Sequence, residues 1–172
     1  MQLKEAILGR RSIRRFGDMD VSEEVVTELI ELGNEAPSAG NLQARDFVVV
    51  KDQKTKEDLA KAAGNQQFIA EASVVVVVCA NMDRIMHYGR RGITLYCLQD
   101  CAAAIQNMLL AIHDKGFGCV WVGAFNESKT SRILGLPGHI RPVAILPIGE
   151  PVSQPAARKR IPVEDLIHYE KW

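Results

Sequence analysis

Hydrophobic positions follow two different patterns along this chain, a helical spacing and a continuous apolar run. Apolar residues three and four apart predict a short helix over 2–8 and a second helix that opens at Asp20 or Ser22 and carries Val25, Leu29 and Leu32. The run "ASVVVVVCAN" (72–81) is continuously apolar and rich in β-branched residues. Such a run predicts a strand covered on both faces, and therefore a central one.

Three further strands are expected, over 46–52, 118–125 and 141–151. Pro142 and Pro147 predict that the last strand lies near an edge or is irregular, because proline cannot donate to a ladder. Short helices are expected in "TKEDLAKAA", with Thr55 and Asp58 as a capping pair, and in "ESKTSRILG". Two helices precede the first strand, which favours an α+β fold over a doubly wound parallel one.

The stretch from about Thr94 to His113 predicts a long helix that is apolar on most sides. Its seam comprises Leu98, Cys101, Ile105, Met108 and Ile112. Such a helix needs cover on most sides, which a second copy of the chain could supply in part, with the core helix of a monomer as the alternative. The tail of about 150–172 lacks a core of its own, so it either lies along its own domain or reaches across to a neighbour. Residues 1–172 are expected to form one domain.

Composition narrows the function classes. The chain has 172 residues, 47% of them hydrophobic and 24% charged, with 21 Lys+Arg against 21 Asp+Glu. This neutral balance argues against a protein that coats nucleic acid, and no apolar run approaches the length of a membrane span. Four cysteines without a CxxC pair favour reduced, buried thiols and a cytoplasmic location.

Common catalytic motifs are absent from the sequence. It has no GxGxxG, no GxxxxGK[ST], no GxSxG and no set of residues with metal-ligand spacing, and its four histidines lie apart. An enzyme built on this chain would therefore take its reactive group from a cofactor.

Arginines cluster near both ends of the chain. The stretch "RRSIRRF" contains Arg10, Arg11, Ser12, Arg14 and Arg15, and the tail contains Arg158, Lys159 and Arg160. Converging guanidinium groups with a serine hydroxyl suit a phosphate, although two solvated basic faces or a loose nucleic-acid patch would give the same pattern. The polar loops "PSAGN" and "GNQQ" favour the first interpretation, because their amides and hydroxyls suit the edge of a heterocycle.

Four segments in order resemble the FMN-dependent nitroreductase family. They are "RRSIRRF", "APSAGNLQ", "QDCAAAIQNMLLAIHDKGFGCVWVGAF" and "RKRIPVEDLIHY", and together they span nearly the whole chain. The resemblance implies an α+β homodimer with a mixed sheet flanked by helices, a long buried helix at the dimer interface, and a tail that crosses the dimer. It also implies two FMN sites, each built from both chains.

The same resemblance assigns site residues. One chain would supply Arg10, Arg11, Ser12 and Arg14, and the other would supply Pro37, Ser38 and Asn41. The remaining candidates are Asn65 at the flavin edge, Val122, Gly123 and Ala124 near flavin N5, and Arg158 and Arg160 at the phosphate. No catalytic side chain and no metal ligand is implied.

The expected activity is a two-step hydride exchange. FMN takes a hydride from NADH or NADPH at N5, and the oxidised nicotinamide leaves. A small electron-poor acceptor, such as a nitroaromatic or a quinone, then binds in the place of the nicotinamide and is reduced by the flavin. Other flavin tasks known in the family are an alternative, namely dehalogenation, dehydrogenation or flavin destruction. A non-catalytic flavin-binding protein and a basic nucleic-acid binder are the remaining alternatives.

Overall fold

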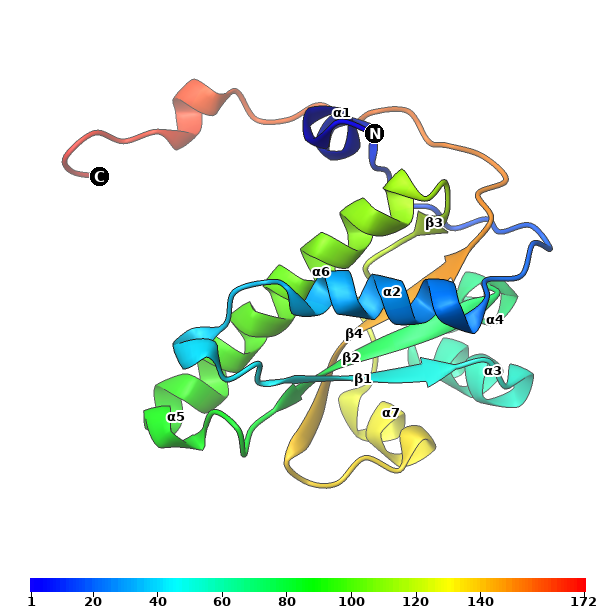
Figure 1. Cartoon of the computed structure of the whole chain (residues 1–172), viewed down its shortest axis with the longest axis horizontal. Helices are drawn as coiled ribbons and strands as arrows, with labels where there is room; N and C mark the ends of the chain where they lie inside the picture. Colours follow the sequence, from blue (N-terminus) through cyan, green and yellow to red (C-terminus); the bar gives the residue numbers. More distant parts are fainter.

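The computed structural model describes residues 1–172 and forms a four-stranded antiparallel sheet between two layers of helices (Figure 1). In chain order the elements are α1 (Leu3–Gly9), α2 (Glu23–Asn34), η1 (Ala39–Asn41), β1 (Arg45–Val50), α3 (Gln53–Ala62), α4 (Phe68–Glu71), β2 (Val74–Asn81), η2 (Met86–Tyr88), α5 (Gly89–Arg91), η3 (Gly92–Tyr96), α6 (Cys97–Asp114), β3 (Gly118–Cys119), α7 (Glu127–Leu134), β4 (Ile140–Gly149) and η4 (Val163–Leu166). The expected α+β class is confirmed, whereas the expected mixed sheet is wrong, because all four strands pair antiparallel and the only parallel pairing is an isolated bridge.

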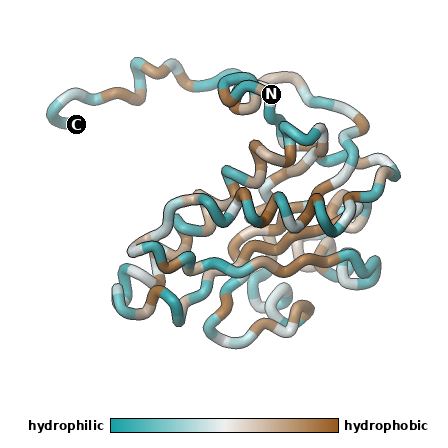
Figure 2. Tube along the Cα trace, viewed as in Figure 1, coloured by the Kyte–Doolittle hydropathy of each residue, from teal (hydrophilic) through white to brown (hydrophobic).

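Strand β2 lies inside the sheet, whose order is β1-β2-β4-β3. All eight of its residues are buried, as its apolar run predicts. Val74, Val76 and Val78 face the core beneath α2 and α6, whereas Val75 and Val77 face the core beneath α3 and α4. Figure 2 shows the hydrophobic colour running along these strands. Burial on both faces is why alternation is absent from this strand's sequence.

The expectation that the last strand lies near an edge or is irregular is confirmed in its second alternative. Strand β4 pairs with β2 along its length and also with β3, so it is an inner strand. The expected irregularity is present, since the register against β2 shifts between Val78 and Cys79, opposite Ala144 and Pro142. Pro147 is tolerated because the ladder between β3 and β4 stops at Cys119, which leaves no strand partner opposite the proline on that side.

The strand expected over 118–125 is also wrong in length. Only Gly118 and Cys119 form β3, and a single bridge joins Val122 to Ile145 beyond it. Gly123 and Ala124 are exposed coil. The chain therefore leaves the sheet where its glycine and alanine begin.

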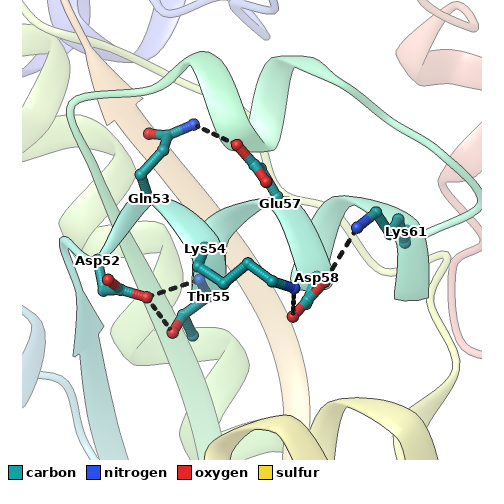
Figure 3. Close-up of polar contacts among 7 residues, drawn as sticks. All are labelled: Asp52, Gln53, Lys54, Thr55, Glu57, Asp58 and Lys61. Carbon is teal, nitrogen blue, oxygen red and sulfur yellow. Dashed lines mark hydrogen bonds and ion pairs between the residues drawn. The ribbon is translucent and has the colours of Figure 1, made fainter.

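The expected capping pair of α3 is wrong as well. The cap is Asp52, whose carboxylate accepts from the Thr55 backbone N–H at 2.8 Å and from its hydroxyl at 2.7 Å (Figure 3). Asp58 instead lies between Lys54 and Lys61 on the exposed face of the helix. Helix α2 is capped by Ser22, one of the two expected residues.

Helix α6 begins at Cys97, after a π-helical turn over Gly92–Tyr96, rather than at Thr94. Cys101, Ile105 and Met108 of its seam are fully buried against the chain's own sheet. The seam itself is thus satisfied within one chain. By length and composition the stretch Met86–Asp114 could cross a membrane, but core helices of soluble proteins pass the same test.

Apolar side chains remain uncovered at α1 and along the tail. Every residue from Val152 to Trp172 is exposed, and the tail extends away from the sheet (Figure 1). The exposed large apolar residues in these two segments are Leu3, Ile7, Leu8, Val152, Ile161, Val163, Leu166, Ile167, Tyr169 and Trp172. Uncovered apolar surface on this scale is typical of an association surface.

The buried thiols predict a loss of stability at alkaline pH. All four cysteines are free and buried, and burial raises the pKa of Cys79 and Cys101 from 9.0 to about 12. The unfolded chain releases these protons at lower pH than the folded chain does. We therefore expect the free energy of unfolding to fall as pH rises from about 9 towards about 12, with no thiol contribution to its pH dependence below that window. Urea titrations across this window measure it, and a Cys79→Ala variant whose loss equals that of the wild type would contradict the assignment.

Candidate functional site

Backbone hydrogen bonds fix the arginine segment beside the short strand β3. The Ile13 N–H donates to the Cys119 carbonyl at 3.0 Å, and Ser12 forms a parallel bridge with Cys119. Ile13 is 5% exposed and packs against Gly118, where a Cβ would lie 2.7 Å from it. The buried isoleucine thus anchors the segment, and its arginines stay at the surface.

The first part of the tail is tied to the same segment. Val152 N–H donates to the Arg15 carbonyl at 3.2 Å, and Gln154 Nε2 donates to the Gly9 carbonyl at 2.9 Å. These bonds join residues more than 130 positions apart and bring 155–160 alongside the arginine segment.

The two arginine clusters line one pocket of about 480 Å³. Its walls are Ile7, Leu8, Arg10, Arg11, Ser12, Arg14, Pro155, Ala156, Ala157, Arg158 and Arg160. Five of these residues are arginines and none is acidic, so the pocket is strongly positive. Lys159 does not line it. A volume of this size suits a small ligand, and the charge requires an anion.

The arginines of this pocket differ in how far they are already engaged. Arg11 donates from one terminal nitrogen to the carbonyls of Leu8 and Arg10, at 2.6 and 2.8 Å, and so helps to cap α1. Arg10 and Arg14 make no side-chain hydrogen bond or ion pair within the chain, and neither do Arg158 and Arg160. Four guanidinium groups are therefore free to bind an anion.

A second set of polar groups lies next to this segment. The Arg14 guanidinium is 6.0 Å from the centre of the Phe68 ring, which follows the "GNQQ" loop. Gln66 Nε2 in that loop donates to the Ala124 carbonyl at 3.1 Å. Asn65, with a φ of 62°, lies in the same loop and is exposed.

The end of the expected strand presents unpaired backbone amides. Val122 is not among them, since its N–H donates to the Ile145 carbonyl at 3.0 Å and it is 4% exposed. The N–H groups of Gly123 and Ala124 have no partner within the chain and are exposed. These two residues can therefore donate to a ligand.

The loop that contains Pro37, Ser38 and Asn41 lies at the other end of α6. Its Ala39 N–H binds Asp100 in the first turn of that helix, whereas the arginine segment lies by Ile112 and His113 in the last turn. Asp100 and His113 are thirteen residues apart, so about 20 Å of helix separates them. One chain therefore does not bring Ser38 and Arg10 to the same pocket.

This distant loop offers hydrogen-bond donors. The Ser38 hydroxyl oxygen accepts from the Gln43 N–H at 3.0 Å, which leaves its proton to donate. The Asn41 side-chain oxygen accepts from Gln43 Nε2 at 2.8 Å, which leaves its NH₂ group. Both groups would suit acceptor atoms on a heterocycle.

Sequence reasoning missed Gln66, Arg45 and Asp100. Gln66 stands within the polar loop that was singled out, but its link to Ala124 depends on the fold. Arg45 is 2% exposed and Asp100 is 4% exposed, and both bind the loop of Pro37 and Ser38. Charged residues beside apolar runs give no sign in the sequence that they are buried.

Comparison with known proteins shows the family of this chain. The model of the family described as "Nitroreductase family" matches residues 7–67 and 60–150. The chain belongs to the nitroreductase family. A relative from Methanothermobacter thermautotrophicus, named as an NADH dehydrogenase/NAD(P)H nitroreductase, is 32% identical over 100% of this chain and 88% of its own length.

Solved structures of nitroreductases have the same fold. A protein of that name from Parabacteroides distasonis is 29% identical, with a TM-score of 0.87 over 98% of both chains. The NADPH:FMN oxidoreductase of Vibrio harveyi, solved with NAD⁺, is 28% identical, with a TM-score of 0.91 over 98% of this chain and 77% of its own. The expectation of an NAD(P)H-dependent enzyme of the nitroreductase type is thereby confirmed.

Proposed function

We propose that this nitroreductase is a homodimer that binds FMN in two sites and reduces small electron-poor acceptors at the expense of NADH or NADPH. The observation that carries the proposal is the pocket with five arginines and no acidic residue. The phosphate of FMN fits this pocket, because guanidinium groups bind phosphate oxygens two at a time. A cytoplasmic location agrees with four buried, unpaired thiols.

Both chains are needed for each site. Arg10, Arg14, Arg158 and Arg160 would hold the phosphate, with Ser12 as a hydroxyl donor and Arg11 as a further cation. Ser38 and Asn41 lie at the other end of α6, so they would come from a second chain whose helix runs in the opposite direction. A twofold dimer brings the first turn of one helix to the last turn of its partner.

The tail supports the same arrangement. Beyond residue 160 it exposes Leu166, Ile167 and Trp172, and α1 nearby exposes Leu3 and Ile7. A tail that crosses the dimer would bury these side chains. We therefore propose that 1–172 is one domain whose tail, from about residue 150, embraces the partner.

Chemistry in this site needs little from side chains. When bound, FMN supplies the hydride chemistry, accepting from the nicotinamide and donating to the acceptor in turn. Ser38, Asn41 and Asn65 would hold the ring, and the free Gly123 and Ala124 amides would donate to it. The bridge at Val122 fixes these amides in advance, so they would stabilise negative charge that develops beside them.

Nitroaromatics and quinones are the acceptor class that we propose. Their reduction takes up a hydride and protons, which water can supply, so it needs no acid or nucleophile from the protein. Donor and acceptor would use the same open face in turn, which accounts for the absence of a dinucleotide-binding glycine motif.

The experiment that tests this function is an anaerobic reduction. Purified protein saturated with FMN should be yellow, and either NADH or NADPH should bleach it in the absence of oxygen. A quinone added afterwards should restore the colour. Protein that stays colourless after incubation with FMN would refute the proposal, and bound flavin that neither nicotinamide reduces would point to another flavin task.

A further inference from the structure

The loop between α2 and β1 has an unfavourable backbone conformation. Gly40, Asn41 and Gln43 have φ values of 58°, 56° and 43°, and two of these residues are not glycine. A Cβ at Gly40 would lie 2.6 Å from the Tyr88 hydroxyl. Left-handed backbone at non-glycine residues costs on the order of 1 kcal/mol each and persists only where the surroundings enforce it. Hydrogen bonds from Gln43 to Ser38 and Asn41 hold this conformation from within the loop, and further bonds reach it from outside.

Arg45 holds the first half of this loop. It begins strand β1, is 2% exposed, and extends its guanidinium under the chain that leaves α2. Its five hydrogen bonds are to the Asn34 carbonyl at 2.7 Å, the Asn34 side-chain oxygen at 3.3 Å, the Ala36 carbonyl at 2.7 Å, the Pro37 carbonyl at 3.4 Å and the Asp100 carbonyl at 3.1 Å. One side chain thus joins the end of α2, the loop, β1 and α6.

Asp100 holds the middle of the loop, whose end is held by Arg84 through a hydrogen bond of 2.9 Å to the Gln43 carbonyl. Oδ1 of Asp100 accepts from the Ala39 N–H at 2.9 Å, at the point where the loop turns into η1. Its Oδ2 is buried without a hydrogen-bond partner, in a residue that is 4% exposed. An unpaired buried carboxylate oxygen is costly, so its retention calls for a role beyond packing.

The two buried charges offset each other at a distance. No Arg45 nitrogen lies within 4.0 Å of an Asp100 carboxylate oxygen, and every atom that Arg45 binds is neutral. Burial lowers the pKa of Arg45, while the charge of Asp100 acts to raise it. Arg45 thus donates to the carbonyls of Ala36 and Pro37, and Asp100 accepts from the Ala39 N–H. The two side chains therefore bind both the acceptors and a donor of the loop.

We propose that Arg45 and Asp100 are positioning residues, which hold the loop over 36–43 in the conformation that presents Ser38 and Asn41 to the flavin of the partner's site. The inference rests on the proposed function. Asp100 belongs to α6, so its bond to Ala39 ties the loop of Ser38 and Asn41 to this helix. The direction of the same helix decides which loop and which arginine segment meet in the proposed dimer. The loop then meets the ring already ordered, and binding does not have to order it.

Two variants loosen the loop without opening the core. Asp100→Asn keeps the size of the side chain and removes its charge. Ala39→Pro removes the N–H that Asp100 accepts and puts the ring Cδ in its place, which displaces the carboxylate from the loop. The extended backbone of Ser38, with φ −144° and ψ 155°, is compatible with a following proline. Should Asp100→Asn fail to fold, Ala39→Pro alone decides the question.

The matched controls are Glu127→Gln and Arg141→Lys. Arg141 binds Glu127 through two hydrogen bonds of 2.9 and 2.8 Å, between β4 and α7, and neither residue touches the loop. These controls alter one charge or one guanidinium elsewhere in the same fold.

Three measurements are made on the full-length protein. Hydrogen–deuterium exchange without FMN reports the order of residues 36–43. Fluorescence titration gives the dissociation constant of FMN, and visible circular dichroism of the saturated protein reports how the bound ring is held.

In both variants we expect faster exchange over 36–43, a dissociation constant raised about tenfold, as for the loss of one charge-assisted hydrogen bond, and an altered visible circular dichroism spectrum. The controls should match the wild type. Unchanged exchange would show that the clamp does not hold the loop. Faster exchange with unchanged affinity and spectrum would show that its role is only structural. Wild-type protein that binds no FMN would overturn the proposed function and this inference together.

Discussion

Replacing Arg10 and Arg14 together by alanine is expected to weaken FMN binding by a factor of roughly a hundred to ten thousand. Each of these guanidinium groups lines the positive pocket and lacks a partner within the chain. A hydrogen bond to a charged group contributes about 1.5–3 kcal/mol, and two such bonds would be lost. Fluorescence titration of the purified protein with FMN measures the change.

The matched control for this double variant is Arg15→Ala. Arg15 belongs to the same segment and is exposed, but it does not line the pocket. Its replacement removes one positive charge, as each of the two pocket replacements does. It should change FMN affinity by no more than about twofold, through long-range attraction alone. Comparable losses from Arg15→Ala and from Arg10→Ala would mean that general positive charge, and not this pocket, attracts the ligand.

The sequence predicts the central part of the fold well, for a physical reason. Five successive valines in β2 can be stable only where both faces of a strand are covered, so this strand had to be internal. For β4, Pro147 indicates only that one side of the strand lacks a ladder bond. That the missing partner is the short strand β3, and not solvent, depends on where the chain turns at Cys119, which no local pattern contains.

The site likewise has residues that the sequence predicts and residues that it does not. Arg14 and Arg158 lie near opposite ends of the chain, yet clusters of one charge without acidic neighbours suggest a shared anion, and both line one pocket. Arg45 could not be found in this manner, because an arginine at the start of a strand usually reaches solvent. Its burial follows from the path of the chain from Ala36 to Pro37 over it, which is a property of the tertiary structure.

The second large effect that we expect is the recovery of FMN binding in a mixed dimer. It follows from the separation of the two half-sites along α6. One chain carries Arg10→Ala with Arg14→Ala, and the other carries Ser38→Ala with Asn41→Ala. Each homodimer should bind FMN too weakly to retain it, because every site lacks either its phosphate ligands or its ring donors. In the mixed dimer one site combines both defects, whereas the other combines two unaltered halves.

Purification through two different affinity tags isolates this mixed dimer, and we expect it to retain one FMN per dimer with wild-type affinity. The reason is the separation of about 20 Å along α6 between the loop of Ser38 and the pocket of Arg10, which prevents one chain from supplying both. If each chain instead folded its own complete site, every site in the mixed dimer would remain defective and no flavin would be retained. The stoichiometry of bound flavin therefore distinguishes a site shared between chains from a site within one chain, independently of which acceptor the enzyme reduces.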